Sequence, residues 1–579
     1  MKKIVLIACC LFTQIVLAQD VSLALQKKPD TNPAQLATQW SKVSTTTNVS
    51  FANRSKRFAQ ELPPEIKQND TWNAGAWKGE KVHTQILLWS KKDLSNVTVN
   101  VSDLKNTKGD LIKKENISTG FLQYVMTDEF RNGCGYRKPQ DFDSSKVADI
   151  INVDIKSMQV QKNTTQPVWV SVKVPSHTSP GLYFGTVVIN ADKKYTLKVA
   201  LKVVDKILPP PSEWAYRLDF WQHPFAIARV HKLEPWSDAH FAMMRKYYTM
   251  LADAGQKIVT TSIVNEPWGH QTYDDFPSLI KWTKKKDGSW TYDYSLFDKY
   301  VDFVMSCGIN KQINCYSMVP WKIAFTYNDE AAGREAVFTQ AIGTPAYNEF
   351  WTPMLTDFTR HLRDKGWFGI TTIAMDERPM PAMQSVIKLL KTIDPNWKVS
   401  LAGDYHAEIE NDIFDYCVAS RWKYPEDVLQ KRKQQNKLST WYTCCAEKYP
   451  NAFTFSPPDE MVWMGWYTAA TGMDGYLRWA YNSWPKSPST DSRFTAWPAG
   501  DTYQVYPGAL SSMRFEKIIE GIQDFEKIRI LRKEYQSKQQ TTQLNKLEAT
   551  LKTFEIKDLA SETAEETVAK AKGLLNEIN

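Results

Sequence analysis

The sequence predicts a multidomain protein with an N-terminal β-sandwich, a central (β/α)8 TIM barrel and a C-terminal helical appendage. Three observations predict this: period-two alternation in the N-terminal third, eight strand-and-helix repeats in the middle, and helical periodicity at the end. The chain has 579 residues, which is more than one hydrophobic core usually organises. We therefore expect several domains.

The predicted sandwich covers residues 19–207. Four of its segments, 82–89, 96–101, 167–174 and 185–189, alternate polar and apolar residues and are rich in β-branched side chains. The turn signal Ser179-Pro180-Gly181 separates the last two. Three consecutive prolines, Pro209 to Pro211, stiffen the chain and cannot continue a central strand, so 208–212 is the predicted linker.

The predicted barrel domain covers residues 213–510. Helical patterns, such as 238–254, 347–365, 382–393 and 459–471, lie between most of its candidate strands. Strands that alternate with helices pair in parallel, and eight such units match a closed barrel. An open doubly wound sheet is the alternative, but no glycine-rich phosphate-binding motif follows any strand. The eight candidate strands are 216–221, 257–264, 311–318, 370–375, 397–403, 416–421, 438–443 and 475–481.

The last region, 511–579, has the pattern of three helices. The first of them spans 513–535 and places its apolar residues on one face. These residues are Phe515, Ile518, Ile519, Ile522, Phe525 and Ile528.

The N-terminus has the pattern of a secretory signal peptide, residues 1–18. Met1-Lys2-Lys3 is followed by an apolar stretch and by Val16-Leu17-Ala18, which has the small-residue spacing of a cleavage site. Cleavage after Ala18 predicts an exported protein of the bacterial periplasm or cell surface. An alternative is a lipoprotein signal in which Cys9 carries the lipid. The apolar stretch is too short to span a bilayer, and no later segment qualifies, so no transmembrane segment is expected.

Composition narrows the class of ligand. The net charge of +8 is small and the lysines are scattered, so we expect no nucleic-acid partner. The 22 tryptophans are typical of sugar-binding proteins, because a flat ring covers the apolar face of a pyranose; core packing is the alternative. The cysteines form no CxxC pair, so we expect no metal, and no cofactor motif is present. Their spacing selects no disulfide, and Cys444-Cys445 fits two small apolar residues near a strand end.

The candidate catalytic residues are Asp376 and Glu377, which end the apolar fourth strand of the predicted barrel. Catalytic residues of (β/α)8 barrels lie at the carboxyl ends of strands. Adjacent carboxylates there raise each other's pKa, which prepares a general acid. The alternative is a helix N-cap without catalytic function.

The adjacency of these acids bears on mechanism. A glycosidase with a carboxylate nucleophile places its two acids on opposite sides of the bond, roughly 5–5.5 Å apart. Two adjacent carboxyl groups on one strand end suit a different division of roles, in which one carboxyl protonates the glycosidic oxygen. The other holds a 2-acetamido group of the substrate, whose oxygen attacks C1.

An ordered set of motifs runs along most of the chain. The motifs are Trp77-Lys78-Gly79-Glu80, Asp219-Phe220-Trp221-Gln222-His223-Pro224, Asp376-Glu377, Tyr476-Leu477-Arg478-Trp479-Ala480-Tyr481, Gly500-Asp501, Tyr506-Pro507-Gly508, Arg514-Phe515-Glu516 and Gly521-Ile522-Gln523-Asp524-Phe525-Glu526. With these motifs the chain resembles glycoside hydrolase family 123, the β-N-acetylgalactosaminidases, over nearly its whole length. The resemblance implies that Glu377 is the acid/base and that Asp376 orients the acetamido group. It also implies a glycan substrate with terminal β-linked N-acetylgalactosamine (GalNAc), on a glycolipid or another oligosaccharide, cleaved with retention.

Aromatic and polar residues at other strand ends are candidate substrate contacts, with core packing as the alternative for each. The candidate contacts are Trp221, His223, Glu266, Trp268, Asp404, Tyr405, Trp422, Tyr442, Trp479 and Tyr481.

Two rival functions remain open. One is a conventional retaining glycosidase that pairs Glu377 with Glu266 or Asp404. The other is a glycan-binding protein without catalysis.

Overall fold

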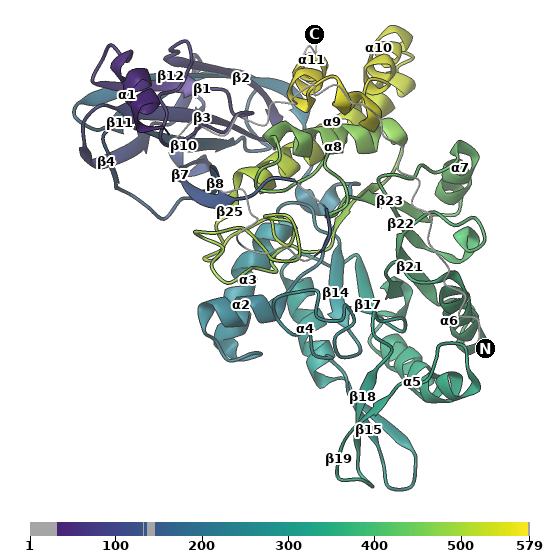
Figure 1. Cartoon of the computed structure of the whole chain (residues 1–579). Helices are drawn as coiled ribbons and strands as arrows, with labels where there is room; N and C mark the ends of the chain where they lie inside the picture. The colour runs from purple at the N-terminus through teal and green to yellow at the C-terminus, as the bar shows by residue number, and fades with distance from the viewer. Residues whose placement is uncertain (1–31, 131–132, 136–144, 577–579) are drawn as a thin grey trace, which may run out of the picture.

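The structure is a computed structural model that describes residues 32–130, 133–135 and 145–576. The predicted signal peptide, with Cys9, lies outside these residues. Figure 1 shows a sandwich of two sheets beside a barrel of strands and helices, with the C-terminal helices between and above them. The predicted multidomain fold is confirmed.

The N-terminal domain begins with helix α1 (Pro33–Ser41) and continues as two packed sheets. The predicted segments 82–89, 96–101, 167–174 and 185–189 lie in β3, β4, β10 and β11. Alternate side chains of both sheets, such as Ile86, Val170, Val187 and Leu201, fill the space between them. One sheet has the order β1 (Thr47–Ala52), β3 (Lys81–Ser90), β10 (Thr164–Lys173), β7 (Ile117–Thr127), β8 (Ser145–Asn152) and β25 (Ser511–Ser512). The other has the order β2 (Thr71–Lys78), β12 (Lys194–Ile207), β11 (Gly181–Asn190), β4 (Leu94–Val101) and β9 (Met158–Val160), with β5 (Leu104–Asn106) and β6 (Leu111–Ile112) at its side.

All eight predicted barrel strands are present, and seven consecutive pairs of them are parallel. The sheet is nearly closed: between its first and last strands there is one backbone bridge, from Leu218 to Gln256. The side chains of Gln222 and Gln256 join the two strands there by hydrogen bonds to backbone groups such as Thr260 N (2.9 Å) and Phe220 N (2.9 Å). In sheet order the strands are β13 (Arg217–Phe220), β24 (Gly475–Arg478), β23 (Leu438–Tyr442), β22 (Asp415–Ala419), β21 (Lys398–Gly403), β20 (Thr371–Met375), β17 (Gln312–Tyr316) and β14 (Ile258–Ser262).

Helices follow seven of the eight strands, and the β21–β22 connection contains only the short 3-10 helix Glu410–Asp412. The connections at the amino ends of the barrel strands are short, and those at the carboxyl ends are longer. The carboxyl ends therefore surround an open mouth of the barrel, where the site described below lies. The helices in chain order are α2 (Pro224–His231), α3 (Asp238–Ala252), α4 (Ser295–Ser306), α5 (Pro345–Asp364), α6 (Met380–Ile393), α7 (Glu426–Gln434), α8 (Pro458–Thr471) and α9 (Met513–Ser537).

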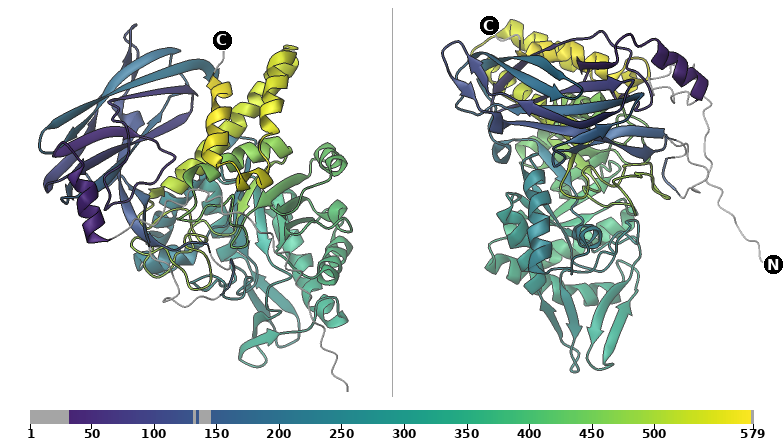
Figure 2. Two further views of the ribbon diagram at one scale, coloured as in Figure 1. Left: turned by 45° about the horizontal axis from the view of Figure 1, so that its top comes forward. Right: turned by 90° about the vertical axis from the view of Figure 1, so that its left-hand side faces the viewer.

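A small four-stranded sheet extends from the barrel on the side away from the sandwich (Figure 2). Two hairpins form it, one from the connection after β14 and one from the connection after β17. The sequence analysis did not predict it. Its strands are β15 (Lys281–Lys284), β16 (Trp290–Asp293), β18 (Phe325–Asp329) and β19 (Arg334–Phe338).

Helix α9 is buried on both faces. Its apolar face packs on α8, and the contact is so close that a Cβ on Gly465 would lie 2.1 Å from the Gly521 carbonyl oxygen. Its polar face meets the sandwich, where Arg514 pairs with Asp149 of β8 at 2.9 Å and Lys527 pairs with Glu80. The amphipathic pattern predicted the helix but not the burial of its charged face. The chain ends in α10 (Thr541–Leu551) and α11 (Ala564–Asn576).

Cys445 forms a disulfide with Cys134, with 4.9 Å between the Cα atoms. The expectation that Cys444-Cys445 is an ordinary apolar pair is therefore wrong for Cys445, while the Cys444 thiol is free. The bond joins the connection after β7 of the sandwich to the connection after β23 of the barrel. Its partners lie 311 residues apart, which is why sequence spacing gave no signal.

Among the described helices, none is both long enough and apolar enough to cross a bilayer.

Candidate active site

The two carboxylates stand at the carboxyl end of β20, where the fully buried run Thr371–Met375 stops. Asp376 accepts a hydrogen bond from Trp321 Nε1 at 2.9 Å and another from the Glu377 backbone N–H at 2.9 Å. Trp321 belongs to the connection after β17, so the Asp376 carboxylate faces that side of the barrel mouth.

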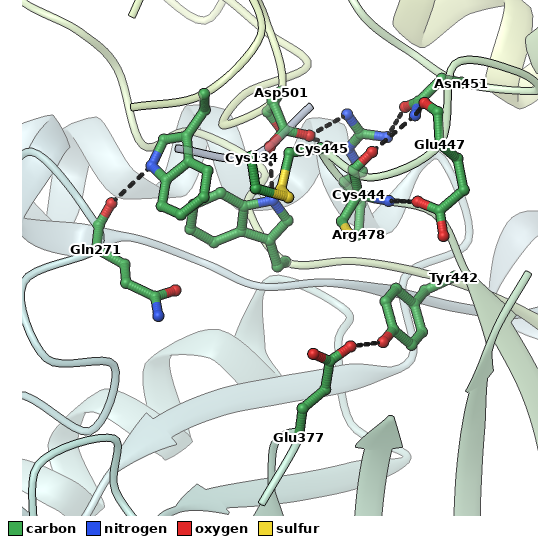
Figure 3. The surroundings of a disulfide bond; sticks show 12 residues. Cys134, Gln271, Glu377, Tyr442, Cys444, Cys445, Glu447, Asn451, Arg478 and Asp501 are labelled. Atoms are coloured by element: carbon green, nitrogen blue, oxygen red, sulfur yellow. Dashed lines mark hydrogen bonds and ion pairs between the residues drawn. A yellow bond between two sulfur atoms is a disulfide. The ribbon is translucent and has the colours of Figure 1, made fainter. Parts of the chain in front are cut away.

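Glu377 is solvent-exposed and faces a different neighbour. The Tyr442 hydroxyl at the end of β23 donates a hydrogen bond to its carboxylate, and Figure 3 shows the two groups pointing toward one another. Tyr442 was predicted as a substrate contact, and the structure brings its hydroxyl to the Glu377 carboxylate. Burial and the Glu377 charge raise the pKa of the Tyr442 hydroxyl, so it stays a donor at neutral pH.

The pKa of Asp376 is raised to about 6. Desolvation is the largest cause, and the neighbouring Glu377 charge adds to it, whereas the hydrogen bonds from Trp321 and Glu377 N oppose it. Asp376 therefore loses its proton near pH 6 and is anionic at neutral pH.

Aromatic side chains form the floor of the barrel mouth beside the carboxylates. Trp221 (after β13) and Trp268 (after β14) stack with ring centres 5.3 Å apart, and Tyr316 (β17) contacts both, at 4.7 and 5.0 Å. Tyr442 belongs to the same apolar cluster, and the partly exposed Trp479 borders it. Trp221, Trp268 and Tyr316 are only 2–3% exposed. Trp479 is the partly exposed ring of this group, and an exposed ring face can bind the apolar face of a sugar.

The Trp479 indole N–H donates to Asp501 at 3.2 Å, and Asp501 pairs with Arg478 at 2.7 Å, both side chains being fully buried. Trp497 packs its edge on Trp479 with ring centres 5.3 Å apart. Figure 3 shows the Asp501–Arg478 pair beside the disulfide. Asp501 thereby fixes the orientation of the Trp479 ring. Asp501 was predicted only as part of a family motif.

Three predicted contacts serve other purposes in the structure. Tyr481 is fully buried in the main core, and its hydroxyl donates to the Tyr247 carbonyl of α3 at 3.1 Å. The Glu266 carboxylate accepts from the backbone N–H groups of Phe276 and His270, which holds its own loop. His223 is buried, and burial lowers its pKa to about 4, so its imidazole is neutral.

The remaining predicted contacts lie after β21 and β22. Asp404 pairs with Arg421, Tyr405 is stacked on Tyr416 with ring centres 6.0 Å apart, and Trp422 is 40% exposed. These residues do not join the aromatic floor of the barrel mouth.

Four residues near the pair were not predicted: Trp321, Arg378, His406 and Arg421. Trp321 follows β17, so the strand-end rule that selected the other aromatics also covers it. Cationic side chains in loops have no such signal, because most are solvated surface residues.

Within the described residues, two groups of side chains have donor atoms close enough for a metal ion. One contains both cysteines of the disulfide together with Cys444; the other is Glu266, His270 and Asp275 on the loop after β14, where the latter two are exposed. Neither includes Asp376 or Glu377.

The chain is similar to a solved structure over most of its length. A family 123 glycoside hydrolase from Clostridium perfringens, studied for glycolipid glycan hydrolysis, is 29% identical, covers 92% of this chain and 99% of its own, and superposes with a TM-score of 0.83. A Bacteroides ovatus GH5 xyloglucanase (8% identity, 82% of this chain and 100% of its own, TM-score 0.28) and a Bacteroides uniformis β-glucuronidase (11%, 79% and 48%, TM-score 0.26) are too dissimilar to carry an argument. No curated protein sequence matches.

The family comparison covers both large domains. The glycoside hydrolase 123 catalytic domain matches residues 221–531, which include the carboxylate pair, the barrel-mouth aromatics and most of α9. The glycoside hydrolase 123 N-terminal domain matches residues 51–191 of the sandwich. The protein is therefore a glycoside hydrolase and belongs to family 123.

Proposed function

We propose that the protein is a retaining exo-β-N-acetylgalactosaminidase that works by substrate-assisted catalysis. The observation that carries the proposal is the placement of both carboxylates on one strand end, joined by the 2.9 Å hydrogen bond from Glu377 N to Asp376. Two adjacent groups on one side of the sugar cannot divide attack and departure between them. The nucleophile then has to come from the substrate.

The other carboxylates considered as a nucleophile are already engaged. Glu266 caps the backbone of its own loop, and Asp404 pairs with Arg421. A conventional pairing of Glu377 with either would require that carboxylate to leave its present partners. Both members of the Asp376-Glu377 pair are present, and this favours catalysis over sugar binding alone.

The proposed reaction has two steps. In the first, Glu377 gives its proton to the glycosidic oxygen as the C1–O bond breaks, and the acetamido oxygen bonds to C1 to form an oxazolinium ion. Anionic Asp376 accepts the acetamido N–H and stabilises the positive charge. In the second, Glu377 takes a proton from water, whose oxygen attacks C1 and reopens the ring. Two inversions at C1 give net retention.

We propose glycans with terminal β-linked GalNAc as substrates, including those of glycolipids. The resemblance to the β-N-acetylgalactosaminidases and the glycolipid glycan hydrolysis studied for the Clostridium perfringens relative support this choice. The partly exposed Trp479 ring beside this aromatic cluster suits the apolar face of a sugar.

The substrate class is tested with three p-nitrophenyl glycosides, the β-GalNAc, β-GlcNAc and β-galactoside. We expect hydrolysis of β-GalNAc, weaker hydrolysis of β-GlcNAc, and none of the β-galactoside, because it lacks the internal nucleophile. A galacto-configured thiazoline, which mimics the oxazolinium, should inhibit more tightly than free GalNAc. Rapid galactoside hydrolysis, or a 2-fluoro sugar trapped on an Asp or Glu, would instead establish the conventional mechanism.

We also propose that the protein is exported. The signal-like N-terminus and the Cys134–Cys445 disulfide both fit an oxidising compartment. Mass spectrometry of the native protein from its own host should find an N-terminus at Gln19 without lipid. An acylated Cys9 would place it on a membrane surface, and an intact Met1 would contradict export.

A further inference from the structure

The outer face of one sandwich sheet carries large apolar side chains. The sheet is that of β2, β12, β11 and β4, and Figure 1 shows β11 and β4 on the side of the sandwich away from the barrel. Tyr183 and Val187 of β11 point into the sandwich core, so the alternate positions of this strand point outward. Two of these outward residues, Leu182 and Phe184, are 46% and 49% exposed.

Strand pairing places lysines beside these apolar residues. Leu182 lies opposite Lys202 of β12, and Phe184 lies opposite Lys105 of β5. Lys105 in turn lies opposite Leu111 of β6, which is 46% exposed. Residues directly opposite on neighbouring strands share a face of the sheet, so these five side chains form one surface.

Two further outward residues of β12, Lys194 and Lys198, extend this surface. Among the outward positions through which β5, β6, β11 and β12 pair with one another, none is a carboxylate. We call this surface the lysine face. It consists of Leu111, Leu182, Phe184, Lys105, Lys194, Lys198 and Lys202.

Most of the positive charge of the lysine face is unpaired. Lys105, Lys194 and Lys202 form no ion pair with any other described residue. Lys198 approaches Asp70 only at 3.8 Å, and both of these side chains are largely exposed. The charge therefore acts on whatever approaches the face from solvent.

Two carboxylates at the ends of β12 do not neutralise this charge. Asp192, in the β11–β12 turn, pairs with Lys92 at 3.1 Å, and Asp205 pairs with Lys78 at 2.6 Å. Each is thus engaged by a lysine outside the lysine face.

Apolar groups beside unpaired cations match the surface of a membrane that contains anionic lipids. Ammonium groups attract the headgroup phosphates, and exposed Leu and Phe side chains become buried at the boundary with the acyl chains. A nucleic acid would pair with the lysines and leave Leu182 and Phe184 in water. The two kinds of side chain together favour lipid.

We infer that the lysine face binds the surface of membranes that contain anionic lipids. The inference goes beyond the proposed function and does not depend on it, because the ligand is the headgroup phosphate and not a glycan. No residue of the lysine face belongs to the barrel, so membrane binding and hydrolysis use different residues.

The test measures co-sedimentation of the protein with two kinds of vesicle, neither of which contains a glycolipid. One kind is phosphatidylcholine alone, and the other contains about one third phosphatidylserine. We expect the parent to bind the phosphatidylserine vesicles about tenfold more tightly or better, and we expect this binding to weaken as salt screens the charges.

Two double variants test the two components of the face. Lys105→Glu with Lys202→Glu should lower the partition coefficient on phosphatidylserine vesicles by about tenfold or more. Leu182→Thr with Phe184→Thr should also lower it by about tenfold, and threonine keeps the preference for a strand. The matched control is Lys285→Glu with Lys286→Glu in the exposed β15–β16 turn, which makes the same change in net charge. Its partition coefficient should equal that of the parent.

Equal binding of the parent to both kinds of vesicle, or binding to neither, overturns the inference. An equal loss in the two double lysine variants overturns it as well, because net charge and not the lysine face would then explain the attraction. Binding of duplex DNA without binding of vesicles would make nucleic acid the partner. Failure to hydrolyse β-GalNAc substrates would contradict the proposed function alone.

A thermal melt of each variant separates loss of binding from loss of folding. The substituted side chains are exposed, so the melting temperatures should match that of the parent. If the glutamate variant melts earlier, Lys105→Gln with Lys202→Gln takes its place, because it removes the two charges without adding any.

Discussion

Glu377→Gln is expected to lower kcat for a β-GalNAc disaccharide by about 10²–10⁴-fold while the fold and substrate binding persist. A galactose leaving group departs as a poor alkoxide unless it is protonated, and glutamine has no proton to give. The amide keeps the size of the side chain and can still accept from the Tyr442 hydroxyl. The measurement is steady-state hydrolysis of the disaccharide beside that of p-nitrophenyl β-GalNAc.

The aryl glycoside should suffer less, because nitrophenolate needs little protonation to leave. Glu408→Gln changes an exposed carboxylate of the β21–β22 connection and serves as the matched control. Near-parental disaccharide turnover in Glu377→Gln would remove Glu377 from the role of acid.

Asp376→Asn is expected to lower kcat by about 10²–10³-fold for the disaccharide and the aryl glycoside alike. A neutral amide cannot stabilise the oxazolinium charge, and this loss is independent of how easily the leaving group departs. That equality distinguishes the variant from Glu377→Gln. Asp412→Asn, which neutralises an exposed carboxylate, is the control.

The dependence of kcat/KM on pH is a second test of the role of Asp376. The pKa of Asp376 is raised to about 6, so its carboxylate is protonated below that pH and anionic above it. We expect kcat/KM of the parent to fall as the pH drops through about 6, and the residual activity of Asp376→Asn to lack this acid limb. An unchanged limb in the variant would assign it to another group.

The place of the candidate carboxylates at the end of a barrel strand could be predicted from the sequence, because the signal for it is local. An apolar strand that stops on two acids marks the functional end of a barrel, and Asp376 and Glu377 stand there. The eight strands were found for the same reason: each is a short apolar run between turn signals.

The features that were missed depend on contacts across the fold. The partner of Cys445 comes from another domain, and the sequence carries no trace of the pairing. Tyr481 follows the last barrel strand as a substrate contact would, yet its side chain turns into the core against α3. Arg421 gains its position from Asp404 on a neighbouring connection, which a linear pattern cannot show.

The burial of the charged face of α9 has a consequence for dissecting this enzyme. Arg514 sits on the barrel side of the interface and Asp149 on the sandwich side, with both side chains fully buried. A shortened enzyme that starts at the linker would keep the guanidinium and lose the carboxylate that pairs with it. It would also lose β8, which pairs with β25 just before α9. The sandwich thus completes the packing of α9, and we expect the smallest active fragment of this hydrolase to include it.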